Sequence, residues 1–382
     1  MTTTINNEHK KLNVPNLRFP EFQGEWEKTK FGDIAVVVGG GTPDTNTSQY
    51  WNGKIQWFTP SEIGRNKYVY NSVRTISEEG LNKSSAKLLP IGTILLSSRA
   101  TVGECSINKK ECTTNQGFQS LIPKENISNE FVYYLIQTKR KDLIRKSCGS
   151  TFLEISANEV RKIVVSIPTI KEQDKIAKLL SLLDERISTQ SKIIDKLQSL
   201  IKGIRNDVFG KLRKDIGLNA KVGDVLSYEQ PQPYIVEDTE YTAGGTPVLT
   251  ANKAFVLGYT SETDGIYDKG DCIIFDDFTL DCKYVDFPFK VKSSAIKILT
   301  AKNKELLRYT FEFLKYLDLS TDEHKRHYIA ETQNQEFILP TTQIVRTIAH
   351  AFSTLSSRMQ TIVKQRDMLE LQKQYLLRQM FI

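Results

Sequence analysis

The sequence predicts an α+β protein in which two globular, β-rich units alternate with two long helices that pair as an antiparallel coiled coil. Three observations predict it. Residues 168–209 align without a gap with residues 340–381, at an offset of 172 positions. Apolar residues in the first copy recur at alternating spacings of four and three, as in a coiled-coil seam. The segments that precede the two copies are rich in β-branched and aromatic residues and are broken by Gly, Pro and Asn, which is typical of strands and turns.

Composition is that of an ordinary soluble globular protein of two or three domains. The chain has 382 residues, of which 39% are hydrophobic and 25% are charged, and this argues against collagenous, disordered and membrane-spanning classes. A formal charge of +7 is a mild basic excess that is compatible with nucleic-acid binding. The first eleven residues lack the apolar segment of a secretory signal, so we expect a cytoplasmic protein with no membrane segment.

Metal and disulfide chemistry is not indicated. The five cysteines include no C-x-x-C pair and read as reduced thiols, and the four histidines are too few for a His-based metal centre. We expect no metal site.

The first globular unit is predicted to span residues 1–167. Strands are expected at 32–38, 91–97 and 118–122, and a helix is expected at 129–146. The second unit is predicted to span 211–339, with strands at 223–226, 246–250, 271–275 and 295–299 and a helix at 304–317. Both units open with a Gly-Asp-[Ile/Val] strand.

The two long helices are predicted at 168–210 and 340–382. Pro168 and Pro340 mark their starts, because proline is tolerated at a helix start but not in its interior. Arg366 and Lys373 interrupt the second apolar stripe. Two amphipathic helices packed on separate domains remain the alternative. The predicted seam residues are Ile176, Leu180, Leu183, Ile187, Ile194, Leu197, Ile201, Ile204, Ile348, Phe352, Leu355, Met359, Ile362, Leu369 and Leu376.

No credible catalytic site is visible, and we expect no catalytic residues. The chain has no P-loop, no G-x-S-x-G elbow and no H-E-x-x-H helix, and Gly39–Pro43 reads as a tight turn. Asp276 and Asp277 with Asp281 and Lys283 could be drawn as a Mg²⁺-binding nuclease cluster. Residues 286–289 (DFPF) suggest a methyltransferase loop, but no cofactor loop accompanies them. A self-contained methyltransferase or nuclease is therefore a weak alternative.

Several segments resemble the specificity subunit of type I restriction-modification systems. They are VPNLRFPEFQGEWE at 14–27 followed by FGDI at 31–34, GTP at 41–43, YWNGKIQW at 50–57, NQGF at 115–118, and the helical stretch from Ile176 to Phe209. The second unit is the weaker match, because it has no Tyr-Trp-x-Gly stretch.

The resemblance implies a non-catalytic reader of double-stranded DNA. Each globular unit would be a target recognition domain for one half of a bipartite, asymmetric site, and the paired helices would set the spacing. Two modification subunits with S-adenosylmethionine would methylate adenine at N6, and two restriction subunits would use ATP and Mg²⁺. This chain would bind none of these cofactors. A coiled-coil adaptor that binds proteins only, without DNA, is the alternative.

DNA readout needs donors, acceptors and cations on exposed loops. Each candidate could equally be a solvated surface or turn residue. The candidates are Arg65, Lys67, Ser98, Arg99, Thr101, Asn115 and Gln116 in the first unit, and Asn252, Lys253, Thr279, Lys283, Lys325, Arg326, His327 and Tyr328 in the second.

Overall fold

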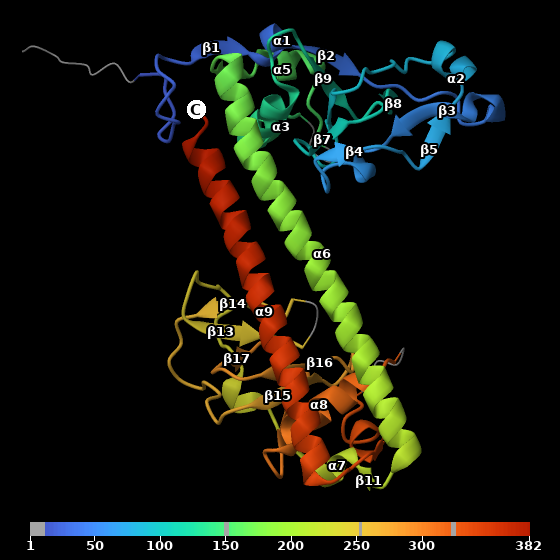
Figure 1. Cartoon of the computed structure of the whole chain (residues 1–382), viewed down its shortest axis with the longest axis vertical. Helices are drawn as coiled ribbons and strands as arrows, with labels where there is room; N and C mark the ends of the chain where they lie inside the picture. The colour runs from blue at the N-terminus through green and yellow to red at the C-terminus, as the bar shows by residue number, and fades with distance from the viewer. Residues whose placement is uncertain (1–11, 149–152, 252–253, 322–325) are drawn as a thin grey trace, which may run out of the picture. The chain divides into compact units, whose positions relative to one another are not determined.

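The computed structural model describes residues 12–148, 153–251, 254–321 and 326–382, and it divides into two compact units (Figure 1). Unit 1 comprises Met1–Ser188 and Arg366–Ile382, and unit 2 comprises Thr189–Gln365. Each long helix therefore contributes one part to each unit. In the described part of the chain, no helix is both long enough and apolar enough to cross a bilayer.

Unit 1 is built on two sheets and a covering helix. The larger sheet has the strand order β2-β9-β6-β7-β4, and the smaller has the order β5-β3-β8. Helix α3 (Asn129–Thr138) contributes Phe131, Tyr134 and Leu135 to the core. The strands are β2 (Ala35–Gly39), β3 (Trp51–Phe58), β4 (Tyr68–Val69), β5 (Arg74–Ile76), β6 (Ile94–Leu96), β7 (Cys105–Asn108), β8 (Cys112–Thr114) and β9 (Gln119–Pro123), and the other short helices are α2 (Glu78–Asn82), α4 (Arg140–Arg145) and α5 (Ala157–Lys162).

Unit 2 repeats this plan with one strand fewer in its larger sheet. One sheet has the order β12-β18-β15-β16 and the other has the order β14-β13-β17. Helix α8 (Leu306–Leu317) packs its Tyr309 and Phe313 into the core. The strands are β12 (Leu226–Glu229), β13 (Thr246–Leu249), β14 (Val256–Thr260), β15 (Cys272–Asp276), β16 (Cys282–Val285), β17 (Lys290–Val291) and β18 (Ile296–Ala301).

The two units share one strand topology. The run β2-β9-β6-β7 matches β12-β18-β15-β16, and all neighbours in both runs are antiparallel. Strand β3 has β5 as antiparallel and β8 as parallel partner, and β13 has β14 and β17 in the same two roles. The duplication seen in the helices therefore includes the globular units.

A strand pair closes each unit before its long helix begins. Strand β1 (Glu27–Lys30) pairs with β10 (Val164–Ile167), and β11 (Ala220–Lys221) pairs with β19 (Glu336–Phe337). Helix α6 (Ile170–Asp215) then begins two residues after Pro168, and α9 (Thr342–Gln379) begins two residues after Pro340. Both proline positions precede helices, as predicted.

The predicted strands at 32–38 and 223–226 are wrong at their starts. Each begins with a helical turn, α1 (Phe31–Ile34) or α7 (Val222–Val225), and the strand follows. The cause is the aspartate of the shared motif. The Asp33 carboxylate accepts a hydrogen bond from the Lys30 backbone N–H at 3.2 Å, and Asp224 accepts one from Lys221 at 2.8 Å, which fixes a capped turn.

The other predicted elements lie where the sequence placed them, within a few residues. The predicted helix at 129–146 is interrupted at Lys139 and forms α3 and α4. Strands β6, β9, β13, β15 and β18 and helix α8 occupy the remaining predicted ranges. The predicted mixture of helix and strand is confirmed.

Within each unit, the segments of α6 and α9 pack antiparallel. In unit 1, Ile176 shares a core with Phe381, and Asp184 pairs with Lys373 at 2.6 Å. In unit 2, the Arg205 guanidinium lies 5.7 Å from the centroid of the Phe352 ring. In an antiparallel pair, each step forward along α6 is matched by a step back along α9, so facing residue numbers add up to a constant. The Asp184–Lys373 and Arg205–Phe352 pairs give the same constant, so both units use one register.

The predicted seam residues are all buried or half-buried. Lys373, which breaks the apolar stripe, is neutralised by Asp184. The polar position is thus matched by a charge on the facing helix.

Candidate nucleic-acid interface

In unit 1, three loops meet at the ends of neighbouring strands. The β6–β7 connection is joined to the β8–β9 connection by a hydrogen bond from the Ser98 N–H to the Gly117 carbonyl at 2.8 Å. The segment after β2 is joined to the end of β8 by a hydrogen bond from the Gly41 N–H to the Thr114 carbonyl at 2.8 Å. A Cβ atom on Gly40 would overlap the Asn115 carbonyl oxygen. The Gly-rich segment is therefore closely packed, but the predicted tight turn at Gly39–Pro43 is wrong, because Gly39 ends strand β2 and residues 40–43 continue without a turn.

These loops bring four predicted DNA-contact residues together. Thr101 and Gln116 are exposed, and the Arg99 side chain is 44% exposed. Asn115 is half-buried, and its Oδ1 accepts a hydrogen bond from the Gly117 N–H at 2.9 Å, so this side chain shapes the turn. Arg65 is also exposed, but it lies in the β3–β4 connection, outside these three loops.

Two predicted residues of unit 1 lack the exposure that readout needs. Ser98 is fully buried. The Lys67 side chain is 8% exposed, and its Nζ lies 3.0 Å from Glu130 and 3.2 Å from the Tyr134 hydroxyl. Burial lowers the pKa of Lys67, although Glu130 opposes this. Expecting exposed side chains at these two positions was wrong, because tertiary partners enclose them.

In unit 2, the β15–β16 turn takes the place of the β6–β7 connection. Asp276 Oδ1 accepts hydrogen bonds from the backbone N–H groups of Phe278 and Thr279, at 3.0 and 2.9 Å. This arrangement holds a tight turn and leaves the Thr279 side chain exposed. Arg326 is exposed as well, and its guanidinium lies 5.9 Å from the centroid of the Phe278 ring. Thr279 and Arg326 are thus brought to one place.

His327 and Tyr328 are buried, at 1% exposure each, so expecting them on an exposed loop was also wrong. Their backbone N–H groups donate to Asp277 Oδ1 at 3.1 and 2.7 Å. Asn252, Lys253 and Lys325 lie outside the described residues.

The acidic residues near β15 have structural partners. Asp277 is buried beside Lys297, with 3.5 Å between its Oδ2 and the lysine Nζ. In the described ranges, no group of three His, Cys, Asp or Glu side chains could hold a metal ion. The geometry thus gives no support to a Mg²⁺-binding nuclease cluster.

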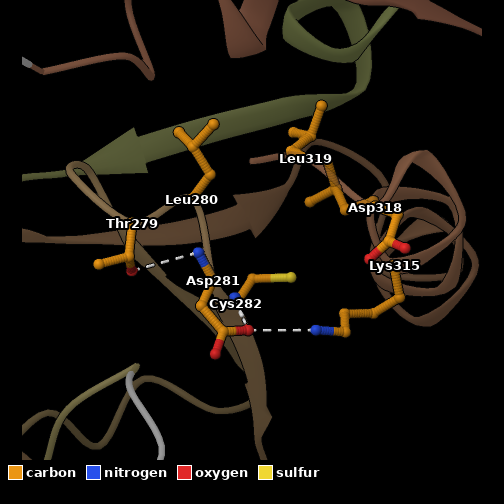
Figure 2. A pocket seen from close by; sticks show the side chains of 8 residues that line it. Thr279, Leu280, Asp281, Cys282, Lys315, Asp318 and Leu319 are labelled. Atoms are coloured by element: carbon orange, nitrogen blue, oxygen red, sulfur yellow. Dashed lines mark hydrogen bonds and ion pairs between the residues drawn. The ribbon is translucent and has the colours of Figure 1, made fainter. Parts of the chain in front are cut away.

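A pocket of about 400 Å³ lies between the β15–β16 turn and the end of α8 (Figure 2). Asp281 lies 3.1 Å from Lys315 and 3.5 Å from Lys283, so the pocket holds a neutralised charge cluster. Burial raises the pKa of the Cys282 thiol to about 12, and the thiol stays protonated at neutral pH. Lys283 is therefore engaged with a carboxylate, and the pocket offers no activated nucleophile. Its lining residues are Thr279, Leu280, Asp281, Cys282, Leu314, Lys315, Asp318 and Leu319.

Three residues at these loops were not among the predicted candidates. Thr42 hydrogen-bonds Gln116, Glu154 pairs with Arg99 at 2.9 Å, and Phe278 lies against Arg326. The repeat could have revealed Glu154, because residue 154 aligns with residue 326 at the offset of 172.

Comparisons with known proteins agree with this architecture. Residues 23–199 match the family model described as the type I restriction modification DNA specificity domain. The chain is 39% identical over 180 residues to the type I restriction enzyme MjaIX specificity subunit of Methanocaldococcus jannaschii, covering 45% of this chain and 42% of that one. It is 45% identical over 126 residues to the EcoR124I/EcoR124II specificity subunit of Escherichia coli, covering 31% of each. The matches thus span less than half the length of these relatives.

Similarity in fold to solved structures extends over nearly all of the chain. The crystal structure of a type I restriction-modification S subunit from M. genitalium aligns with a TM-score of 0.63 and 16% identity, covering 97% of this chain and 99% of that chain. A chain from a structural study of type I R-M complex assembly and conformational transition aligns with a TM-score of 0.54 and 14% identity, covering 92% and 96%.

Proposed function

We propose that this chain, which belongs to the specificity subunits of type I restriction-modification systems, is a non-catalytic reader of a bipartite, asymmetric DNA site. Unit 1 reads one half of the site and unit 2 reads the other. The observation that carries the proposal is one strand topology used twice, with unlike side chains on the equivalent β6–β7 and β15–β16 loops. A shared frame with different loops is what two readers of different sequences require.

The long helices are the proposed spacer between the two readers. Helix α6 has 46 residues, which at about 1.5 Å per residue makes a rod of about 69 Å. One turn of duplex is about 34 Å, so a stiff rod of this size can hold two readers at a fixed separation on DNA. The common antiparallel register of α6 and α9 in both units supports a continuous paired rod. A flexible linker would not fix the distance.

Catalysis belongs to partner subunits in this proposal. Two modification subunits carry S-adenosylmethionine and methylate adenine at N6, and two restriction subunits use ATP and Mg²⁺. The chain itself binds no cofactor and works in the cytoplasm. Supporting this division, Asp277 holds backbone N–H groups and Lys297, and the Cys282 thiol is protonated at neutral pH.

The test is to map methylated adenines in cells that express the modification subunits with and without this chain. We expect one bipartite motif that depends on the chain, and replacing the globular part of unit 1 by that of a relative should change one half only. Binding to a duplex should also weaken steeply with salt, because phosphate contacts release counterions. A purified complex that binds no duplex at low salt would instead establish a protein-only adaptor.

A further inference from the structure

The strand registers of the two units can be matched residue by residue at the candidate interface. Ser97 pairs with Phe118 next to β6, and Asp276 pairs with Ile296 in β15 and β18. The next residues, Ser98 and Asp277, therefore occupy equivalent positions at the start of the two reading loops.

A backbone hydrogen bond confirms this match and adds a second segment to it. The Ile155 N–H donates to the Ser98 carbonyl at 3.0 Å, and the His327 N–H donates to the Asp277 carbonyl at 3.1 Å. Residues 155 and 327 are 172 positions apart, which is the offset of the long helices. The residue after Ser98 and the residue before Ile155 form a pair in unit 1. The residue after Asp277 and the residue before His327 form the equivalent pair in unit 2. Arg99 faces Glu154 in unit 1, and Phe278 faces Arg326 in unit 2.

Each pair presents one arginine, but from opposite sides. In unit 1 the arginine comes from the β6–β7 loop, and its Nε lies 2.9 Å from Glu154, with the two side chains 44% and 41% exposed. In unit 2 the arginine comes from the facing segment and lies over the Phe278 ring. Among the described residues, the structure gives Arg326 no ion pair with a carboxylate. Both pairs therefore include a guanidinium, but its partner is a carboxylate in unit 1 and an aromatic ring in unit 2.

Stability does not account for the unit 1 pair, because exposed ion pairs contribute little. Recognition does account for it. Arginine donates two hydrogen bonds to guanine O6 and N7, and a carboxylate accepts from cytosine N4. The negative charge of Glu154 also repels phosphates, so it directs Arg99 toward base edges. A phenylalanine ring instead suits the methyl group of thymine.

We propose that Arg99–Glu154 and Arg326–Phe278 are the equivalent specificity-determining positions of the two units, each contacting base edges in its own half-site. Unit 1 selects G·C at its position because it offers both a donor fork and an acceptor. Unit 2 pairs the donor fork with an apolar contact. This inference rests on the proposed DNA-reading function and names the residues that carry it out.

The experiment uses the full chain with its modification subunits and maps the methylated motif. The double variant Arg99→Phe with Glu154→Arg transplants the unit 2 pair into unit 1. We expect one base position of one half-site to change, with the other half and the spacing retained. Glu154→Gln should relax the preference at that position by roughly ten- to hundred-fold. Arg99→Ala is a milder variant that keeps the inference testable if the double variant does not fold.

Controls come from exposed ion pairs away from the loops. Arg145→Ala removes a pair with Asp142 on α4, and Arg346→Ala removes a pair with Glu305 in unit 2. Both should leave the motif unchanged.

Two results would overturn the inference while leaving the proposed function intact. One is an unchanged bipartite motif in both Arg99→Ala and Arg326→Ala. The other is an equal loss of affinity for all sequences with a smaller salt slope, which would mark phosphate contacts. If the unaltered complex methylates no chain-dependent motif, the proposed function itself fails.

Discussion

At the scale of single residues, one carboxylate in each unit links the covering helix to α6. Glu130 on α3 accepts hydrogen bonds from Lys67 and from Ser181 of α6, both at 3.0 Å. Glu312 on α8 is 1% exposed and lies 2.7 Å from Arg205 of α6 and 2.8 Å from Arg308. Glu130 is half-buried and Glu312 is fully buried, and each carboxylate fixes its helix to the α6 segment of its own unit.

Replacing Glu130 by Gln should destabilise unit 1 at neutral pH. Burial opposes ionisation of Glu130, but hydrogen bonds from Tyr68 and Lys67 outweigh it, so the pKa lies below its ordinary value of 4.5. Its stabilisation is therefore present above pH 4.5 and is lost as the pH falls through the lowered pKa of the folded state. We expect the free energy of unfolding to fall by about 2 kcal/mol at pH 7, and to depend less steeply on pH in the acid range.

Urea unfolding between pH 3 and 7 measures both effects. Glu125→Gln, at an exposed position before α3, is the matched control and should change stability by less than about 0.5 kcal/mol. Equal acid limbs for Glu130→Gln and the unaltered protein would show that Glu130 is not the titrating group.

Two glycines should respond oppositely to alanine. A Cβ on Gly32 would lie 3.0 Å from the Arg161 Cβ, where α1 packs on α5, and Gly32→Ala should cost about 1–3 kcal/mol. Gly203 lies within α6 with no heavy atom within 4 Å of its added Cβ, and Gly203→Ala should stabilise by about 0.5–1 kcal/mol. Thermal unfolding of both variants checks the signs. Destabilisation by Gly203→Ala would mean that α6 needs flexibility there.

At the scale of elements, the sequence predicted what depends on local pattern. The apolar stripes, the prolines before α6 and α9, and strands rich in β-branched residues all carry a periodic signal. The turns α1 and α7 were missed because they depend on an aspartate cap and on close packing through Gly32 and Gly223. Strands β7 (CSIN) and β8 (CTT) have only four and three residues, too few for a periodic signal, and they form because neighbouring strands hold them.

The candidate interface was predicted only in part, for a similar reason. Arg99, Thr101, Gln116, Thr279 and Arg326 lie on exposed loops, as turn-rich text between strands indicates. Burial of the other candidates depends on partners far along the chain. Lys67 is enclosed by Glu130, and the segment at 327–328 is fastened by Asp277. Single-sequence reasoning has no access to such pairings.

The buried residues at the start of the two candidate DNA-contact loops predict how two substitutions combine in their effect on stability. By register, Asp277 corresponds to Ser98 and Lys297 corresponds to Gln119, so unit 2 has a buried ion pair where unit 1 has neutral side chains. Asp277→Ser removes the carboxylate beside the buried Lys297, which keeps its hydrogen bond to Gln230, and should cost about 3–5 kcal/mol. Adding Lys297→Gln should recover more than half of that loss.

Chemical denaturation of the four proteins of this cycle gives the coupling energy. Asp281→Ser, which removes a half-exposed carboxylate of the same turn, is the control for the loop itself. Additive effects of the two substitutions would contradict the assigned correspondence.

At the scale of the whole molecule, the two repeats differ in length, because unit 1 has additional residues in the middle of its globular part. The offset is 172 for residues 155 and 161 and for the long helices, but Asp33 and Asp224 are 191 apart. Unit 1 is therefore 19 residues longer between its first helical turn and α5. The first helical turn contacts the equivalent segment near the end of the globular part in both units, since Gly32 packs against Arg161 and Gly223 packs against Gln333. The frame is constant, and the segments that form the loops vary.

The proposed spacer makes a quantitative prediction about the DNA site. In the proposed continuous rod, extending the register shared by the two units assigns the step from Ser188 to Thr189 in α6 to the step from Met368 to Leu369 in α9. Inserting one heptad at both steps preserves the seam and lengthens the rod by about 10 Å, which corresponds to about three base pairs of duplex. The methylated motif should keep both half-sites and gain about three base pairs between them. A heptad inserted in α6 alone breaks the pairing and serves as the control, with loss of methylation expected. An unchanged spacing in the doubly extended protein would show that the paired helices do not set the distance between the two readers.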